Sequence, residues 1–148
     1  MIIHIATDHA GLELKEKVKS YLSKLDYEVI DHGAYEYDAL DDYPDFIFPC
    51  AKAVSNDLNS KGIILGGSGQ GEAMAANRVK GVRAAVFYNG PDEIIKLSRL
   101  HNDANILCLG ERVLGSGTAL DIVDAFVNTN FEGGRHLRRV DLVTELES

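Results

Sequence analysis

Five short runs in this chain are apolar at almost every position rather than at every second position. A strand with one solvated face alternates apolar and polar residues, so continuous apolar runs indicate strands that are covered on both faces, as in a parallel sheet. Amphipathic segments separate the runs. The runs are IIHIA (2–6), YEVID (27–31), GIILG (62–66), RAAVFY (83–88) and NILCLG (105–110).

The segments between the runs have the pattern of surface helices. In 11–25, lysines lie opposite a stripe of apolar residues, which predicts a helix packed on a sheet. A second helix is expected to begin near Pro44, a residue suited to a first turn. Pro49 follows about one turn later, so this helix is expected to be kinked or to start late. The stripe in 11–25 is Leu14, Val18, Tyr21, Leu22 and Leu25, and the further helices are predicted over 72–79, 91–100, 118–127 and about 135–147.

This alternation predicts an α/β fold, a three-layer α/β/α sandwich around a Rossmann-like, doubly wound sheet of five parallel strands. The 148 residues contain no repeat or linker, so one domain over residues 1–148 is expected. Ligands of such sheets bind beyond the carboxyl ends of the strands. The polar residues after the first, third and fifth runs should therefore meet at one edge; they are Thr7-Asp8-His9, a glycine loop and Gly110-Glu111-Arg112.

Composition excludes some partners. The net charge of −8 argues against a nucleic-acid ligand, because phosphate backbones are bound by basic surfaces. The N-terminus has no signal-peptide pattern and no apolar run approaches about 20 residues, so no membrane association is expected.

Cys50 and Cys108 are far apart in sequence, in apolar surroundings, and could pair only if the fold brought them together. Reduced buried thiols, a cytoplasmic location and no zinc site are the expectation.

The glycine loop, GGSGQGEAMAANR (66–78), follows the third run. It is not a Walker A motif or a dinucleotide fingerprint, because Glu72 stands where Lys or Gly is required, and Gln70 excludes a GxSxG elbow. Backbone N–H groups before a helix favour negative charge. Glu72 would repel a bound phosphate but could move a proton beside a developing oxyanion, as a general base whose pKa burial raises. The alternatives are a flexible turn and a carboxylate that only favours the helix dipole.

Two further polar pairs flank the predicted strands. Asp8-His9 follows the first run, where Asp8 either binds ligand or caps the next helix. His101-Asn102 ends a helix before the fifth run. His101 is there either an acid or base near the ligand edge of the sheet or a partner of the helix dipole.

Basic residues crowd near the C-terminus of this acidic chain, in Arg135, His136, Arg138 and Arg139. On a helix Arg135 and Arg139 are four residues apart and share a face, where two guanidinium groups can clamp a phosphate dianion. The alternative is a set of solvated arginines that pair with surface acids.

Four motifs in order, TDHAG, GGSGQGEAMAANR, RLHNDANIL and EGGRHLRRV, resemble the ribose-5-phosphate isomerase B family over essentially the whole chain. The group includes galactose-6-phosphate isomerase subunits and allose-6-phosphate isomerase. The resemblance implies an aldose–ketose isomerase of the pentose phosphate pathway that interconverts ribose 5-phosphate and ribulose 5-phosphate through an enediolate, without metal or other cofactor. One branch uses a cysteine base at the position of Gly66, and the other uses a glutamate at the position of Glu72. The chain resembles the glutamate branch.

The resemblance also implies roles for single residues. Glu72 would shuttle the proton between C2 and C1, His101 would open the sugar ring beside Asp8, and Ser68 would assist the enediolate. Members of the family are dimers, sometimes paired into tetramers, and the neighbouring subunit completes each active site. The helix over 135–147 is therefore expected to pack on a partner subunit. The other substrate-binding residues implied are Gly67, Gly69, Gln70 and Gly71 at the enediolate, Asn102 at hydroxyls, and His9, Arg112, Arg135 and Arg139 at the phosphate.

Three alternatives to this function remain open from the sequence. In the first, the substrate is a six-carbon sugar phosphate such as allose or galactose 6-phosphate, and in the second the chain is a subunit that needs a different partner chain. In the third, the chain is a non-catalytic module that binds a sugar phosphate as a signal. The last alternative needs the arginines but has no use for Glu72, Ser68 and His101 together.

Overall fold

A computed structural model of the chain describes residues 1–147 and has a sheet of five parallel strands in its middle layer. The strand order is β2-β1-β3-β5-β4, so the chain winds outward in both directions from β1 and β3, as the sequence predicts. The elements are β1 (Ile2–Thr7), the 3-10 turn η1 (His9–Gly11), α1 (Leu12–Lys24), β2 (Glu28–Asp31), α2 (Pro44–Asn56), β3 (Lys61–Gly66), α3 (Gln70–Ala76), β4 (Ala84–Phe87), α4 (Glu93–Asn102), β5 (Ile106–Gly110), α5 (Ser116–Asn128) and α6 (Arg135–Glu145).

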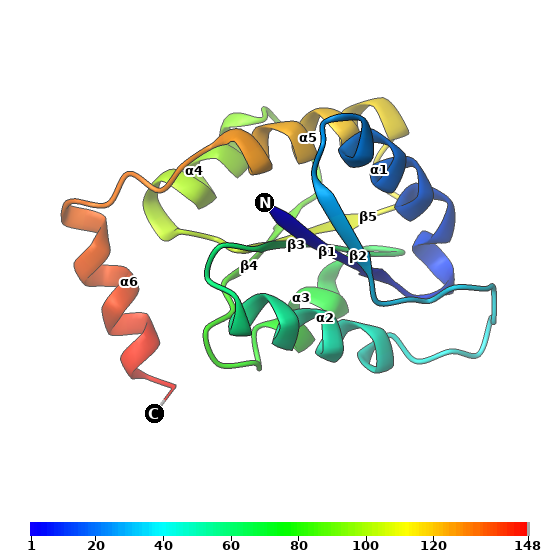
Figure 1. Cartoon of the computed structure of the whole chain (residues 1–148), viewed down its shortest axis with the longest axis horizontal. Coiled ribbons are helices and arrows are strands. Elements are labelled where there is room, and N and C mark those ends of the chain that lie inside the picture. The colour runs from blue at the N-terminus through cyan, green and yellow to red at the C-terminus, as the bar shows by residue number, and fades with distance from the viewer. Residues whose placement is uncertain (148) are drawn as a thin grey trace.

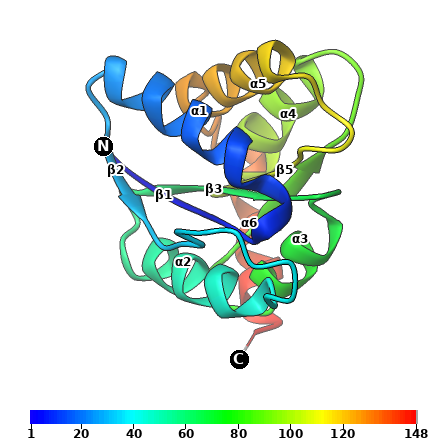
Figure 2. The same cartoon turned by 90° about the vertical axis from the view of Figure 1, so that its right-hand side faces the viewer.

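Helices cover both faces of the sheet. Figure 1 shows α1, α4 and α5 on one face and α2 and α3 on the other, and the view in Figure 2 separates the three layers. The helix α6 stands apart from the sandwich, beside α4, on the side where the strands begin (Figure 1). The predicted three-layer, doubly wound sandwich is therefore confirmed.

The central strands bury alternate residues in two separate apolar clusters. In β3, Ile63 and Leu65 pack against the layer of α1, α4 and α5, whereas Ile64 packs against α2 and α3. Because successive side chains of a strand point to opposite faces, a strand covered on both sides is apolar throughout. This arrangement explains the continuous apolar runs of the sequence.

The helices follow the predicted apolar stripes with two local differences. In α1, Leu14, Val18 and Leu22 are buried, but Leu25 lies beyond the helix end and is exposed. α2 begins at Pro44 and continues through Pro49, so the expected late start is wrong. Pro49 is exposed, so water can reach the backbone carbonyl that a proline leaves without its N–H partner. None of the described helices is both long and apolar enough to cross a membrane.

A buried ion pair ties α1 to the loop that follows β2. The Nζ of Lys15, which is 1% exposed, donates to Asp31 Oδ1 at 2.9 Å and to the Ala34 carbonyl at 2.5 Å. Burial opposes the charge of Asp31, but hydrogen bonds from Lys19, Lys15 and the Gly33 backbone outweigh it and lower the pKa of Asp31. Lys15 therefore fixes the start of the loop over residues 32–43.

We predict that Lys15→Met lowers the free energy of unfolding by about 3 kcal/mol, because it leaves the largely buried Asp31 side chain and a buried backbone carbonyl with fewer partners. The matched control is Lys96→Met, since Lys96 is 46% exposed and pairs with the exposed Asp92. That change should cost less than about 1 kcal/mol. Urea denaturation measures both variants, and equal losses would contradict a structural role of the buried pair.

Candidate functional site

The candidate site lies where the winding of the sheet reverses. β1 and β3 are neighbours, but β1 leads through α1 to β2 on one side and β3 leads through α3 to β4 on the other. The loops that leave such strands in opposite directions open a crevice at the carboxyl edge, which is the usual ligand site of this architecture. The backbone N–H groups of Glu111 and Arg112 donate to the carbonyls of Gly66 and Gly67 at 2.8 and 3.0 Å. The predicted meeting of these loops at one edge is confirmed.

The glycine loop is pressed against the end of β5. Gly69 has a φ of +81°, a left-handed conformation that favours glycine, and a Cβ at Gly110 would lie 2.6 Å from the Ser68 carbonyl oxygen. The Ser68 hydroxyl accepts a hydrogen bond from the Gln70 N–H at 3.3 Å, and both side chains are exposed. The first N–H groups of a helix have no acceptor within it, so the start of α3 offers donors to a ligand at this exposed loop.

Glu72 lies in the first turn of α3 and is only 5% exposed. Its carboxylate fills the space beside Gly66, where an added Cβ would overlap it and would lie 2.8 Å from Oε2. Burial raises the pKa of Glu72, and the nearby negative charge of Asp8 adds to the rise, against a hydrogen bond from the residue's own backbone N–H. A carboxylate with a raised pKa is suited to take up and return a proton near neutral pH.

The rim of the crevice carries cationic groups. His9 Nδ1 lies 2.6 Å from Asp41 Oδ1; this hydrogen bond raises the pKa of His9, and the charge of Asp8 adds to the rise. The Arg112 guanidinium covers Gly67, since a Cβ there would lie 3.1 Å from Cζ. Sequence reasoning did not single out Asp41. It is one of several aspartates in an acidic loop, and only its contact with His9 distinguishes it.

Asp8 has both of the roles that the sequence left open. Its Oδ1 accepts from the Ala10 N–H at 2.9 Å, so it caps the turn η1. It is also buried within electrostatic reach of Glu72. The cap holds this second carboxylate in a defined position at the crevice.

His101 and Asn102 lie at the opposite edge of the sheet, so the expectation of His101 near the ligand edge is wrong for a single chain. They end α4, which leads into the amino end of β5. Nearby, the Asn105 N–H donates to the carbonyl of Arg83, just before β5 and β4 begin. A crossover helix runs antiparallel to its strands, so its last residues lie where the next strand starts.

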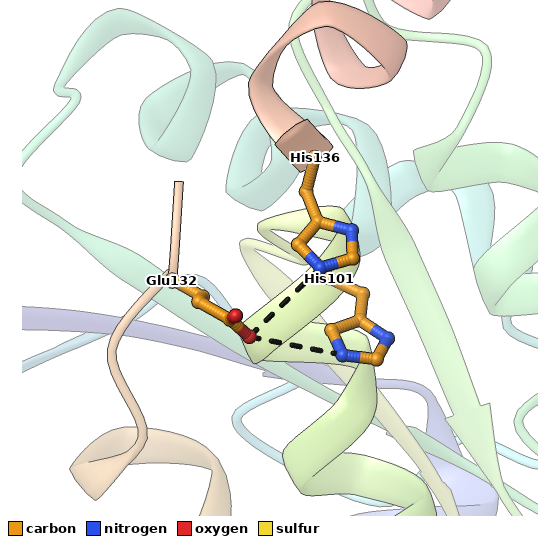
Figure 3. Close-up of side chains that lie close together, drawn as sticks. All are labelled: His101, Glu132 and His136. Atoms are coloured by element: carbon orange, nitrogen blue, oxygen red, sulfur yellow. Dashed lines mark ion pairs between the residues drawn. The ribbon is translucent and has the colours of Figure 1, made fainter. Parts of the chain in front are cut away.

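The arginines of α6 belong to this second group. Arg135 and Arg139 are exposed on α6, and Arg139 Nη1 donates to the Arg135 carbonyl at 3.1 Å. The His101 ring stacks on His136 with centroids 4.1 Å apart, beside Glu132 (Figure 3). The candidate residues therefore form two groups at opposite edges: Asp8, His9, Gly67, Ser68, Gly69, Gln70, Gly71, Glu72 and Arg112 at one, and His101, Asn102, Arg135 and Arg139 at the other.

A donor-rich glycine loop, a buried carboxylate and a cationic rim at a sheet's switch point define a site for proton transfer on a small anionic molecule. Comparison with known proteins identifies the family. The model of the Ribose/Galactose Isomerase family matches residues 3–143. This chain belongs to that family.

Relatives match over nearly their whole length. A probable ribose-5-phosphate isomerase B of Mycoplasma pneumoniae is 44% identical, over 98% of this chain and 94% of the relative. The crystal structure of ribose-5-phosphate isomerase B from Mycoplasma genitalium with bound ribulose-5-phosphate superposes with a TM-score of 0.94 at 43% identity, covering 99% of this chain and 95% of that one. The structure of a Clostridium thermocellum ribose-5-phosphate isomerase B superposes with a TM-score of 0.93 at 47% identity, covering 99% of this chain and 97% of that one.

We predict that Gly66→Ala lowers the free energy of unfolding by about 1–3 kcal/mol, because the added methyl displaces the Glu72 carboxylate. Gly117→Ala is the matched control, since a Cβ there meets nothing within 4 Å. In a Glu72→Ala background the cost at Gly66 should fall below about 0.5 kcal/mol. Urea denaturation of wild type, Gly66→Ala, Glu72→Ala and the double variant measures this coupling. An unchanged cost of Gly66→Ala in the Glu72→Ala background would show that Glu72 is not what occupies the space.

Proposed function

We propose that this protein interconverts ribose 5-phosphate and ribulose 5-phosphate by proton transfer between C1 and C2. The observation that carries the proposal is the Glu72 carboxylate, buried beside Gly66 with a raised pKa, at the start of the helix that follows the glycine loop. The names of the relatives support the five-carbon substrate, as does the ribulose-5-phosphate bound in the Mycoplasma genitalium protein.

The chemistry requires one base and one oxyanion site. Glu72 takes the proton from C2 of the open-chain aldose and returns it to C1, while the hydroxyl proton moves from O2 to O1. Negative charge develops on these oxygens in the enediolate, where N–H groups of residues 67–71 and the Ser68 hydroxyl donate hydrogen bonds. Each well-placed donor of this kind contributes about 3 kcal/mol to the barrier reduction.

The remaining roles concern the ring and the phosphate. His101 acts as the acid that opens the furanose ring, with Asp8 at the sugar and Asn102 at its hydroxyls. A phosphate dianion is bound by cations, best by forked guanidinium groups. Arg112, Arg135 and Arg139 supply these groups, and His9 adds a positive charge that its hydrogen bond to Asp41 favours.

A homodimer completes this site. Residues at opposite edges of one chain cannot meet on one small substrate, but two copies related by a twofold axis bring the Glu72 edge of each to the His101 edge of the other. Support comes from α6, which stands outside the sandwich and exposes apolar side chains beside its arginines. We infer that the chain acts as one domain whose α6 packs on the partner. The exposed apolar residues are Leu137, Leu142 and Val143 in α6 and Leu146 directly after it.

Dimer pairing into tetramers and the cellular location are further parts of the proposal. Sedimentation of the purified protein distinguishes a dimer from a tetramer. The two cysteines, Cys50 and Cys108, are free and buried, which fits an enzyme of the reducing cytoplasm.

We predict that Glu72→Gln lowers kcat for ribose 5-phosphate by a factor on the order of 10² or more, because the amide keeps the shape but removes the base. A coupled assay of ribulose 5-phosphate formation measures the change. Glu93→Gln is the control, since Glu93 is exposed on α4 and should keep wild-type turnover. Near-normal turnover of Glu72→Gln would show that another group is the base.

The same assay tests the alternatives. Higher kcat/KM with allose or galactose 6-phosphate than with ribose 5-phosphate would replace the five-carbon substrate. Solvent deuterium incorporated into the sugar requires a working base, so its absence would favour a binding module.

We predict that subunits complement each other. One variant carries Glu72→Gln and the other carries Arg135→Ala with Arg139→Ala, and each alone should be nearly inactive at low substrate concentration. A heterodimer purified through two different tags has one site with Glu72 and both arginines, and should regain about half of wild-type activity. A heterodimer as inactive as its parents would contradict a site shared between subunits.

A further inference from the structure

Outside the crevice, the junction of α4 and α6 gathers three groups that ligate metals. His101 Nε2 lies 3.8 Å from Glu132 Oε2, and His136 Nε2 lies 3.9 Å from the same oxygen. Figure 3 shows both rings turned toward this carboxylate, with the two marked ion pairs converging on it. All three ligand atoms lie within 4.8 Å of one another. His101 comes from the end of α4, Glu132 from the loop before α6, and His136 from the start of α6.

A second observation points to a ligand at this place. His136 is 7% exposed, and its Nε2 is buried with no hydrogen-bond partner among the described residues. A buried polar atom without a partner is costly, so it calls for a group that can bind it. An imidazole nitrogen that makes no hydrogen bond is available to bind a metal.

We propose that His101, Glu132 and His136 form a binding site for a divalent transition metal of the Zn²⁺ class. Two imidazoles and one carboxylate are a common zinc ligand set that leaves a fourth position open. Zn²⁺ bonds of about 2.0–2.1 Å place neighbouring ligand atoms of a tetrahedron about 3.3 Å apart, so each of the two His–Glu132 pairs needs to close by about 0.5 Å. The side chains of His101 and Glu132 are 38% and 55% exposed and are free to make this adjustment.

The stacking of the rings sets the required movement. The two imidazole planes are 14° apart with centroids separated by 4.1 Å, so the nitrogen lone pairs, which lie in these planes, do not converge on one point. His136 is held by its burial, and therefore His101 must turn about its side chain to aim Nε2 at a shared ion. Glu132 supplies the negative charge that offsets the positive charges of Arg135 and Arg139 nearby.

The second cluster of possible ligands in the described residues is less suited to a metal. It consists of Asp8, His9 and Asp41. Asp41 Oδ2 is also buried without a hydrogen-bond partner among the described residues. However, His9 Nδ1 and Asp41 Oδ1 already bond to each other at 2.6 Å, so the only histidine of this cluster has its nearest ring nitrogen occupied. This cluster therefore serves as an internal comparison.

Occupation of the site has a consequence that rests on the proposed function. A metal on His101 Nε2 occupies the side chain assigned to ring opening, so Zn²⁺ acts as a reversible inhibitor of the isomerase. The same ion also links the end of α4 to the start of α6, which carries Arg135 and Arg139.

Metal binding is measured first, without reference to activity. Zn²⁺ is titrated calorimetrically into the intact purified protein, and Co²⁺ is added separately to record the visible absorption of a tetrahedral site. Glu132→Gln should weaken Zn²⁺ affinity at least about tenfold and reduce the Co²⁺ absorption. Glu93→Gln and Asp41→Asn should leave both unchanged. His136→Gln should weaken affinity equally, and circular dichroism confirms whether this buried variant is folded.

The proposal is overturned if Zn²⁺ binds Glu132→Gln as tightly as wild type, or if Asp41→Asn rather than Glu132→Gln abolishes binding. The inhibitory effect is measured next, by the isomerase rate of each protein relative to its own metal-free rate. The Zn²⁺ concentration for half inhibition should rise at least about tenfold in Glu132→Gln. Binding at His101, Glu132 and His136 without inhibition would leave the site standing and would overturn the acid role of His101 in the proposed function.

Discussion

The arrangement of this protein depends on the burial of its parallel strands on both faces. Buried strands carry mainly apolar side chains, so most of the polar chemistry lies in the loops beyond their ends. The pairing of β3 with β1 and β5 brings three such loops to one edge, and backbone hydrogen bonds from Glu111 and Arg112 to Gly66 and Gly67 join two of them. Gly110 is required there because the backbone of Ser68 lies where its side chain would be.

Lys15 and Glu72 are both charged groups that are removed from water, and the protein compensates for the cost of this burial in different ways. Lys15 is paired with Asp31 and a carbonyl, so its burial strengthens the attachment of a loop. Burial beside Gly66 raises the pKa of Glu72, and the charge of Asp8, which has the same sign, adds to the rise. A raised pKa is the property that proton transfer needs. The missing side chain at Gly66 is what gives this carboxylate its space.

The separation of the candidate residues into two edges follows from the direction of a crossover helix. It places His101 and the arginines of α6 far from Glu72 within one chain. The proposed sharing of a site between two copies accounts for this separation. The same junction of α4 and α6 brings His136 and Glu132 beside His101. The residue assigned to ring opening therefore also belongs to the proposed metal site, so that one side chain is open to both substrate and metal.

The sequence by itself determined the α/β class, the five strands, most of the helix positions and the importance of the glycine loop. These features follow from local periodicity and from residue types, which a linear pattern contains. The tertiary structure decided which groups meet. The contact of Asp41 with His9, the place of Glu72 beside Gly66, the cluster of His101 with Glu132 and His136, and the position of His101 at the far edge each depend on how distant segments pack. Such contacts leave no periodic signal, because they are set by sheet order and helix direction rather than by neighbouring residues.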